Sequence, residues 1–285
     1  MIIMKTKVFI LLMAILGFTV TSCQKTKLLE ESTVNAADDA AFSETLFDDV
    51  FASLEIATSI AENTLKSASI TDTCPLITVT FPGDLAWPRN VVIDYGEGCT
   101  GLNDIVRSGK IIISVSGPRR ETGSVRTLTF DNYYCNGVKI EGTKSIENMG
   151  PNNAGNVVFS VTLTDGKITL PDGRFIERES VREREYVSGY STINPWDDEC
   201  MITGSATGVN LDGLSYTHTI TSALYWKAVC RFIVSGTIKF EVEGIEPFDL
   251  DYGDGECDAK AILTRGDETR EITLGFRHPK FQVTR

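Results

Sequence analysis

A helical pattern of apolar residues marks the N-terminal part of the chain. Between residues 36 and 68, apolar side chains return every fourth position, and most of the aspartates fall on other faces. The spacing predicts one amphipathic helix over residues 36–68, and a break near Thr58 stays open. We expect its apolar stripe to pack on the protein's own sheet rather than on a partner helix or a membrane surface. The stripe consists of Phe42, Leu46, Val50 and Leu54.

The chain changes to a β pattern after this helix. Over residues 69–285, short runs rich in Val, Ile, Thr, Phe and Tyr alternate with Gly, Asn, Asp and Pro. Asn136-Gly137 predicts a hairpin with a type I′ turn, because both residues tolerate positive φ angles. The fold class is therefore predicted as mainly β, an antiparallel meander of about a dozen strands in a large sandwich or an open barrel-like sheet. Further turns are predicted at Asp165-Gly166, Asp172-Gly173, Asp212-Gly213 and Gly266-Asp267.

One unit of strands and turns occurs twice in this β region, over residues 74–115 and 230–274. In each copy a cysteine precedes a strand that ends in Asp-Tyr-Gly-[Glu/Asp]-Gly, and a second cysteine follows. The cysteines are 25 residues apart in the first copy (74 to 99) and 27 in the second (230 to 257). We predict one bridge in each copy, Cys74–Cys99 and Cys230–Cys257, each stabilising the fold by about 3 kcal/mol. Cys135 and Cys200 are left over, and a bridge between them is inferred only by elimination.

Residues 175–187 carry an unusual alternation of charge. Alternate positions place Glu177, Glu179, Glu183 and Glu185 on one face, and the other face carries Arg178, Arg182 and Arg184. Because neither face suits a dry core, we predict an exposed or edge strand whose charges pair with neighbouring strands. A helix with paired charges is one alternative. Another is a polar sheet surface on which the three arginines bind a charged glycan or peptide.

The first 22 residues have the layout of a secretory signal. Lys5 and Lys7 precede an apolar run over residues 8–18, which is too short for a transmembrane helix of about 20 residues. Val20-Thr21-Ser22-Cys23 resembles the lipobox of bacterial lipoproteins. The resemblance implies cleavage before Cys23, acylation of its sulfur and amine, and durable attachment to a membrane. Residues 23–35 then form a polar tether.

Removal of the signal makes the protein more acidic. Loss of its two lysines leaves 25 positive and 39 negative side chains, a net charge of −14. An acidic protein of this kind is not expected to bind nucleic acid. No later stretch approaches 18 apolar residues, so the lipid is the one membrane contact that we predict. Six cysteines remain after Cys23, an even number that favours disulfides in an exported chain.

Catalytic chemistry has little support in the sequence. The two histidines, His218 and His278, lie far apart, and no nucleophile elbow, zinc-protease motif or phosphate loop is present. His218 lies in an alternating strand and is expected to be a packed or exposed strand residue. The aspartates of residues 249–258 suit a tight turn better than a calcium site, because their spacing departs from the EF-hand pattern. We therefore predict no catalytic residue, no metal and no cofactor.

Three tryptophans are the candidate ligand-contacting aromatics. Trp87, Trp196 and Trp226 lie in or beside loops, where their rings could stack on sugars, although aromatic residues of β proteins are more often part of the core. A pair of carboxylates for glycoside hydrolysis stays open, because such pairs form in space rather than in sequence.

Several segments of the chain form a distinctive combination. They are the lipobox, Cys74-Pro-Leu-Ile-Thr-Val-Thr-Phe, Ile93-Asp-Tyr-Gly-Glu-Gly-Cys-Thr-Gly, Arg107-Ser-Gly-Lys-Ile-Ile, Thr129-Phe-Asp-Asn-Tyr-Tyr and Leu250-Asp-Tyr-Gly-Asp-Gly-Glu-Cys-Asp. Together they resemble a group of uncharacterised outer-membrane lipoproteins of Bacteroidota. The resemblance covers most of the mature chain and implies attachment to the outer membrane, without an activity to transfer. In that group a lysine and acids soon after the lipid cysteine accompany surface display. Here Gln24-Lys25-Thr26-Lys27 delays the acids to Glu30 and Glu31, so the periplasmic or surface face stays open.

Together these patterns predict a lipid-anchored, non-enzymatic protein of the cell envelope. It would be a disulfide-stapled scaffold that binds or organises a partner, which could be a glycan or another envelope protein. A glycan-binding accessory lipoprotein is the alternative, and a carboxylate-dependent hydrolase comes third. An aromatic-lined groove would favour the glycan-binding lipoprotein, and two facing acids would favour the hydrolase. A flat charged sheet would favour the non-enzymatic scaffold.

Overall fold

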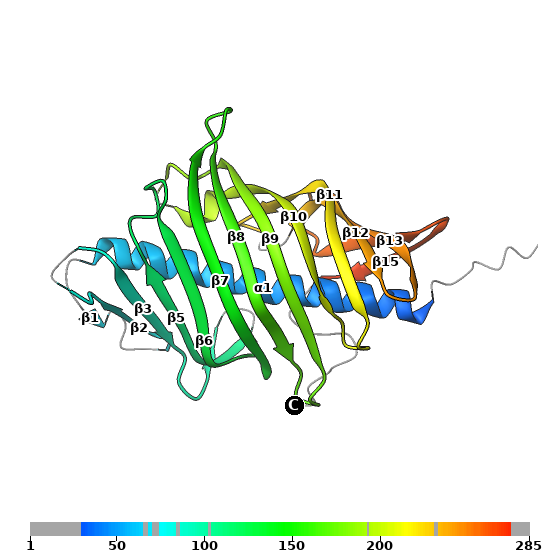
Figure 1. Ribbon diagram of the computed structural model, residues 1–285, viewed down its shortest axis with the longest axis horizontal. Coiled ribbons are helices and arrows are strands. Elements are labelled where there is room, and N and C mark those ends of the chain that lie inside the picture. The colour runs from blue at the N-terminus through cyan, green and yellow to red at the C-terminus, as the bar shows by residue number, and fades with distance from the viewer. Residues whose placement is uncertain are drawn as a thin grey trace, which may run out of the picture.

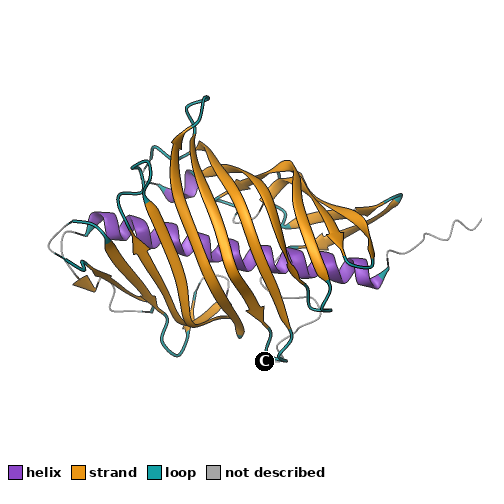
Figure 2. Ribbon diagram, in the orientation of Figure 1, coloured by secondary structure: helices purple, strands orange, loops and turns teal. Residues whose placement is uncertain are grey.

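One long helix lies against the concave face of one large, curved sheet (Figures 1 and 2). The computed structural model describes residues 30–64, 68–69, 74–83, 86–101, 104–192, 194–230 and 233–274. Helix α1 spans Glu31–Asn63, and the short 3₁₀ helix η2 spans Pro195–Asp197. The strands are β1 (Ala68–Ser69), β2 (Leu76–Thr80), β3 (Arg89–Asp94), β4 (Cys99–Thr100), β5 (Val106–Val115), β6 (Val125–Cys135), β7 (Val138–Pro151), β8 (Val157–Thr169), β9 (Phe175–Ser188), β10 (Glu199–Val209), β11 (Ser215–Lys227), β12 (Ile233–Val242), β13 (Ile245–Asp254), β14 (Lys260–Arg265) and β15 (Glu268–Thr273).

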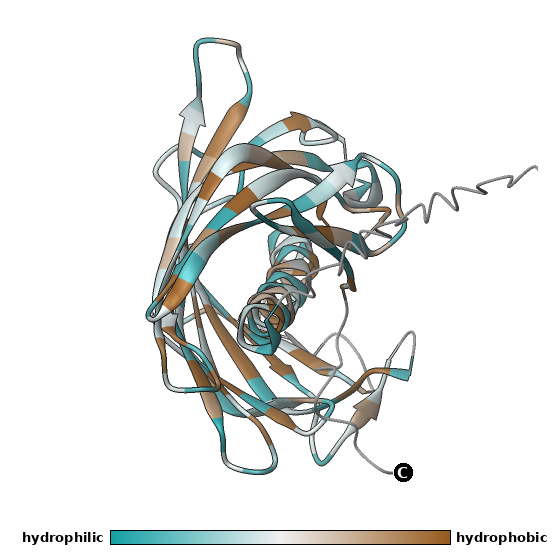
Figure 3. Ribbon diagram, turned by 90° about the vertical axis from the view of Figure 1, so that its right-hand side faces the viewer, coloured by the Kyte–Doolittle hydropathy of each residue, from teal (hydrophilic) through white to brown (hydrophobic). Residues whose placement is uncertain are grey.

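The described strands form a single antiparallel meander. Each strand pairs with the next along the chain, except that β3 pairs with β5 and the short β4 lies off this path against β5. The sheet runs from β1 to β15 without closing on itself. Viewed along α1, it curves around the helix and leaves one side open (Figure 3). The predicted mainly β meander with one N-terminal helix is confirmed, in the open form rather than as a sandwich.

Most of the predicted turns join strands as expected. Asn136 and Gly137 connect β6 to β7 with φ angles of 50° and 78°, the positive values that a type I′ turn needs. The turn predicted at Asp165-Gly166 is wrong, because both residues lie inside β8. There the register with β9 shifts between Leu163 and Gly166, which is a bulge. A Cβ added at Gly166 would lie 2.4 Å from the carbonyl oxygen of Arg178, so this close approach requires glycine.

Helix α1 is more deeply buried than an amphipathic surface helix. It begins at Glu31, within the predicted tether, and ends at Asn63 without a break at Thr58. Phe42, Val50 and Leu54 have 2% exposure or less, and many of its other apolar residues are also buried. The prediction that α1 packs on the protein's own sheet is confirmed.

The prediction for β9 is wrong. The strand lies between β8 and β10 near the middle of the sheet, and Arg178, Arg182 and Arg184 are 3%, 6% and 2% exposed. Their face points inward because acidic residues of α1, more than 130 residues away, supply partners inside the core. The opposite face is exposed at Glu177 and Glu183, as expected for the outer face of a sheet.

Both predicted bridges of the repeated units are present. Cys74 and Cys99 have Cα atoms 5.6 Å apart, and those of Cys230 and Cys257 are 5.2 Å apart. The third bridge is not formed, since Cys135 on β6 and Cys200 on β10 are both free and buried.

The predicted signal segment and Cys23 lie outside the described residues. Within the described ranges, no helix is both long enough and apolar enough to cross a membrane.

Candidate ligand-binding site

Ion pairs hold α1 against the sheet. Glu44 lies between two arginines of β9, with its Oε2 2.7 Å from Nη2 of Arg178 and 2.8 Å from Nη2 of Arg182. Burial alone would raise the pKa of Glu44, but Arg182 and Arg178 outweigh it and lower the pKa to about 2. Asp48, one helical turn later, pairs with Arg184. These pairs compensate charges that would be costly to bury alone.

The same arrangement continues along the second half of the helix. Asp49 pairs with Arg107 of β5 at 2.6 Å, measured between Oδ1 and Nη2. Glu55 accepts from Nη1 of Arg126 at 2.6 Å, and its other oxygen lies 2.7 Å from Nε of Arg119. The helix is therefore fixed in register by acids along its length.

A large cavity opens beside this second half of α1. Its volume is about 310 Å³, and three parts of the chain form its walls. The helix contributes Asp48, Asp49, Ser53, Glu55 and Ile56. The first disulfide unit contributes Cys74, Pro75, Tyr95, Cys99, Ile105 and Arg107, among others. The third wall, from the ends of β9 to β11, contributes Tyr186, Trp196, Asp198, Trp226 and Ala228.

Asp198 is the least compensated carboxylate of the large cavity. Its Oδ2 lies 3.4 Å from Nη2 of Arg119, whereas the same guanidinium approaches Glu55 to 2.7 Å. Burial raises the pKa of Asp198 to about 6, and the negative charges of Glu55 and Asp197 add to this effect. A carboxylate in this position favours a cation or a hydrogen-bond donor inside the cavity.

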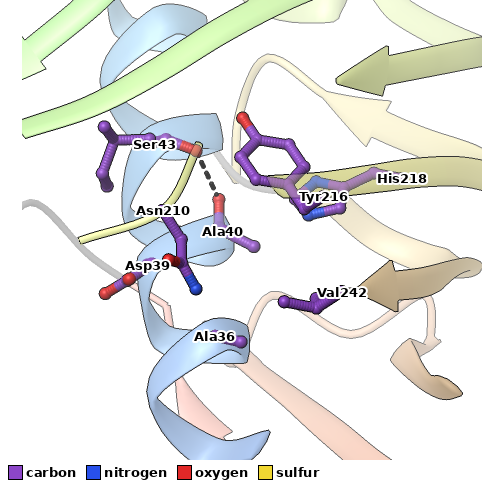
Figure 4. A pocket seen from close by; sticks show the side chains of 9 residues that line it. Ala36, Asp39, Ala40, Ser43, Asn210, Tyr216, His218 and Val242 are labelled. Atoms are coloured by element: carbon purple, nitrogen blue, oxygen red, sulfur yellow. Dashed lines mark hydrogen bonds between the residues drawn. The ribbon is translucent and has the colours of Figure 1, made fainter. Parts of the chain in front are cut away.

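A small cavity lies beside the first half of α1 (Figure 4). It holds about 10 Å³, which is room for roughly one water molecule. Asn210 faces the helix here, and its buried Nδ2 atom has no hydrogen-bond partner. His218 packs between Tyr216 and Phe240, with ring centroids 4.0 and 4.1 Å away.

The surroundings of His218 suit a core residue better than a general base. Burial lowers its pKa well below the ordinary value, and the nearby Arg178 and Arg182 lower it further. The sequence left open whether this strand residue is packed or exposed, and the structure shows that it is packed.

No family model, curated protein or solved structure matches this chain.

Two of the three candidate tryptophans come together at the large cavity. Trp196 lies on η2 and Trp226 near the end of β11, and both line the wall. Trp87 lies elsewhere, with its ring 4.0 Å from the guanidinium carbon of Arg89. Arg89 in turn donates to the carbonyl oxygen of Thr64 at 3.1 Å and so caps the end of α1.

The three candidate arginines of β9 do not line the large cavity. Arg178 and Arg182 pair with Glu44 beside the first half of α1. Arg184 pairs with Asp48, which lines the large cavity, but Arg184 itself is not a lining residue. They hold the helix in place.

Sequence reasoning did not find Tyr95, Tyr186 or Asp198 as site residues. Tyr95 belongs to the repeated Asp-Tyr-Gly segment, which was a usable signal. The other two carry no local motif.

The aspartates of the repeated turns act on the backbone. Asp94 accepts from the amide of Gly96 at 2.9 Å, and Asp251 accepts from that of Gly253 at 2.8 Å. Both contacts are those of an Asx turn, which is the role that the sequence favoured over calcium binding.

Proposed function

We propose that this protein is a non-enzymatic binding lipoprotein of the outer membrane that takes a small ligand with an apolar body into the large cavity. The observation that carries the proposal is the cavity of about 310 Å³ with Tyr95, Tyr186, Trp196 and Trp226 in its walls. Small-molecule sites typically occupy about 300–1,000 Å³ and combine apolar and aromatic walls with a few polar groups. The large cavity fits this description at its lower limit.

The size of the large cavity also supports a binding role. Protein interiors are close-packed, with few voids larger than a water molecule. A hollow of about 310 Å³ is therefore unusual in a protein of this kind, and a ligand that fills it would gain contacts with its apolar and aromatic walls.

The two disulfides support a place outside the cytoplasm, because such bridges persist in oxidising compartments. Attachment through an acylated Cys23 is part of the proposal and rests on the lipobox resemblance. Replacing Cys23 with alanine should abolish fatty-acid labelling and release the protein into the soluble fraction. Continued membrane attachment of the variant would contradict the anchor.

The cavity is tested with N-phenyl-1-naphthylamine, a neutral aromatic probe that fluoresces in apolar surroundings. The protein without its signal should bind one probe molecule, and Trp226→Ala should weaken the affinity at least tenfold, about 1.4 kcal/mol. Trp87→Phe is the matched control, because Trp87 lies away from the cavity. Equal affinity in the wild type and in Trp226→Ala would contradict the proposed site.

A second candidate is glycan binding, favoured by the convergence of Trp196 and Trp226 on one cavity. Aromatic rings stack on the apolar faces of sugars. A glycan array probed with the wild type and with a Trp196→Ala, Trp226→Ala double variant distinguishes this candidate. A glycan signal that the double variant lacks would favour it over the apolar ligand.

A further inference from the structure

The walls of the large cavity combine aromatic rings with carboxylates. Asp48, Asp49, Glu55 and Asp198 line it, whereas Arg107 is the one cationic side chain among its lining residues. The arginines that compensate the other acids, Arg119, Arg126 and Arg184, are not among the lining residues. Each of these acids has an arginine partner, but only Arg107 is itself a lining residue, so a ligand in the cavity contacts acids and rings in preference to arginines.

Asp198 is the carboxylate of this cavity whose negative charge is least compensated by an arginine. The one ion pair described for it is the 3.4 Å approach to Arg119, whose Nε atom is held by Glu55 at 2.7 Å. Asp49, by contrast, has Arg107 at 2.6 Å. A positive group placed beside Asp198 would offset a charge that the protein compensates poorly.

We propose that the ligand of the large cavity is an organic cation, a protonated amine or quaternary ammonium group on an apolar or aromatic body. The charge would lie near Asp198, and the body would contact Trp226 and Tyr186. This inference rests on the proposed function and names its ligand class. Aromatic faces attract ammonium groups through the quadrupole of the ring, and cages of aromatic side chains are a recognised way to bind quaternary ammonium.

Other ligand classes fit the cavity less well. An anion would contact four lining carboxylates and one lining cation, Arg107, which already pairs with Asp49. A metal ion has little to bind to, since the described residues contain no cluster of three or more His, Cys, Asp or Glu side chains arranged for one. The net charge of −12 for the full chain also draws cations toward the protein.

The test compares three ligands of nearly equal size at pH 7.5. Phenyltrimethylammonium, its neutral isostere tert-butylbenzene and the anion benzoate each compete with N-phenyl-1-naphthylamine. The cation should bind at least tenfold more tightly than tert-butylbenzene, and benzoate should not compete. Equal or tighter binding of tert-butylbenzene would overturn the cation assignment and leave the proposed cavity intact. If Trp226→Ala binds the naphthylamine probe as tightly as the wild type does, the proposed function itself is contradicted, whatever the result for the cation.

Asp198→Asn tests the position of the charge. This variant should lose about tenfold in affinity for phenyltrimethylammonium and keep its affinity for tert-butylbenzene. The matched control is Glu183→Gln, which removes one carboxylate from the exposed outer face of β9. An equal loss for both ligands in Asp198→Asn would show a structural effect and overturn the role given to Asp198.

A pH titration of the wild type gives the same information without a variant. The charged groups that act on Asp198 are Arg119, Glu55 of α1 and Asp197 of η2. The pKa of Asp198 is about 6 and that of Glu55 is lowered from its ordinary value, so Asp198 is the group of this cluster that gains a proton first. Affinity for phenyltrimethylammonium should fall several-fold between pH 7.5 and pH 5, while that for tert-butylbenzene stays constant. A cation affinity independent of pH over this range would contradict the proposal.

Discussion

The two halves of α1 meet the same sheet with opposite results. Beside Ala36–Ser43 the contact is filled and leaves a cavity of about 10 Å³, whereas beside Asp48–Ile56 it leaves about 310 Å³. Both halves carry apolar residues, and both are tied to the sheet by buried acid–arginine pairs. The architecture can therefore pack tightly around this helix, and the hollow at its second half is a local feature.

The two disulfide units follow the same division. Tyr95 and Tyr252 occupy equivalent places in the repeated Asp-Tyr-Gly segment, and both are buried. Tyr252 lies in the filled half, near Glu44, Arg178 and Arg182, whose charges act on its hydroxyl group. Tyr95 lines the large cavity together with the bridge of its own unit. One unit has thus become part of a packed core and the other part of a cavity wall.

Loss of a buried acid beside the filled first half of α1 should strongly lower the stability of the fold. Glu44→Ala would leave Arg178 and Arg182 buried without their partner and should destabilise the fold by about 3–5 kcal/mol. Urea unfolding measures the change, with Glu31→Ala at the exposed start of α1 as a control that should alter stability by less than about 0.5 kcal/mol. Similar small losses in both variants would show that the Glu44 pairs do not hold the helix.

Removing either disulfide should lower the stability of the fold by a similar amount, but the two removals should differ in their effect on probe binding. Replacing either cysteine pair with serine should cost about 3 kcal/mol, because the closed loops have nearly the same length. Only the loss of Cys74–Cys99 should also weaken probe binding, since both of its cysteines line the large cavity. Equal effects of the two double variants on naphthylamine affinity, measured where both remain folded, would remove this distinction.

Lys144 of β7 is a buried cation that α1 compensates incompletely. Its Nζ donates to the carbonyl oxygen of Phe47 at 3.0 Å, and burial, aided by Arg184, lowers its pKa from 10.5 to about 7. In the unfolded chain this lysine stays protonated up to about pH 10.4, so the free energy of unfolding should rise as the pH increases from 7 toward 10.

Lys144→Met should remove this dependence. The variant should be more stable by about 1–4 kcal/mol at pH 7, because an apolar side chain replaces a poorly compensated charge. Chemical denaturation at pH 7, 8.5 and 10 provides the measurement. A wild type with a flat or falling stability over this range would contradict the lowered pKa.

A pair of alanine substitutions compares the packing of the two halves. Ala40 lines the small cavity and Ala228 lines the large one, and both are buried. Ala40→Leu should destabilise by about 1–3 kcal/mol through overpacking, whereas Ala228→Leu should change stability by less than about 0.5 kcal/mol. Ala228→Leu should instead weaken naphthylamine binding. Thermal unfolding and probe titration on the same samples separate the two effects.

Features that depend on residues close together in the sequence could be predicted. The hairpin at Asn136-Gly137 depends on the φ preferences of two residues, and the bridges followed from a repeat that places cysteines at matched distances. The helix and the meander followed from periodicity, although α1 extends five residues farther toward the N-terminus, from 36 to 31.

Features that depend on contacts between distant residues could not be predicted. β9 was predicted to be an exposed or edge strand because neither of its charged faces suits a dry core, yet Glu44, 134 residues before Arg178 in the chain, pairs with that arginine inside the fold. Glu44, Asp48 and Glu55 share a helical spacing that could have suggested an acidic stripe, but nothing local links it to β9. The large cavity could not be predicted for the same reason, because Asp49, Cys99 and Trp226 are distant in the sequence and come together only in the folded protein.

A crystal structure of the protein with 4-bromophenyltrimethylammonium tests the central claim most directly, since the anomalous signal of bromine locates the ligand. The account predicts one bromine site inside the large cavity, with the ring against Trp226 and Tyr186 and the ammonium group beside Asp198. A ligand bound only on the outer face of the sheet, or a cavity filled by the protein's own side chains, would contradict it.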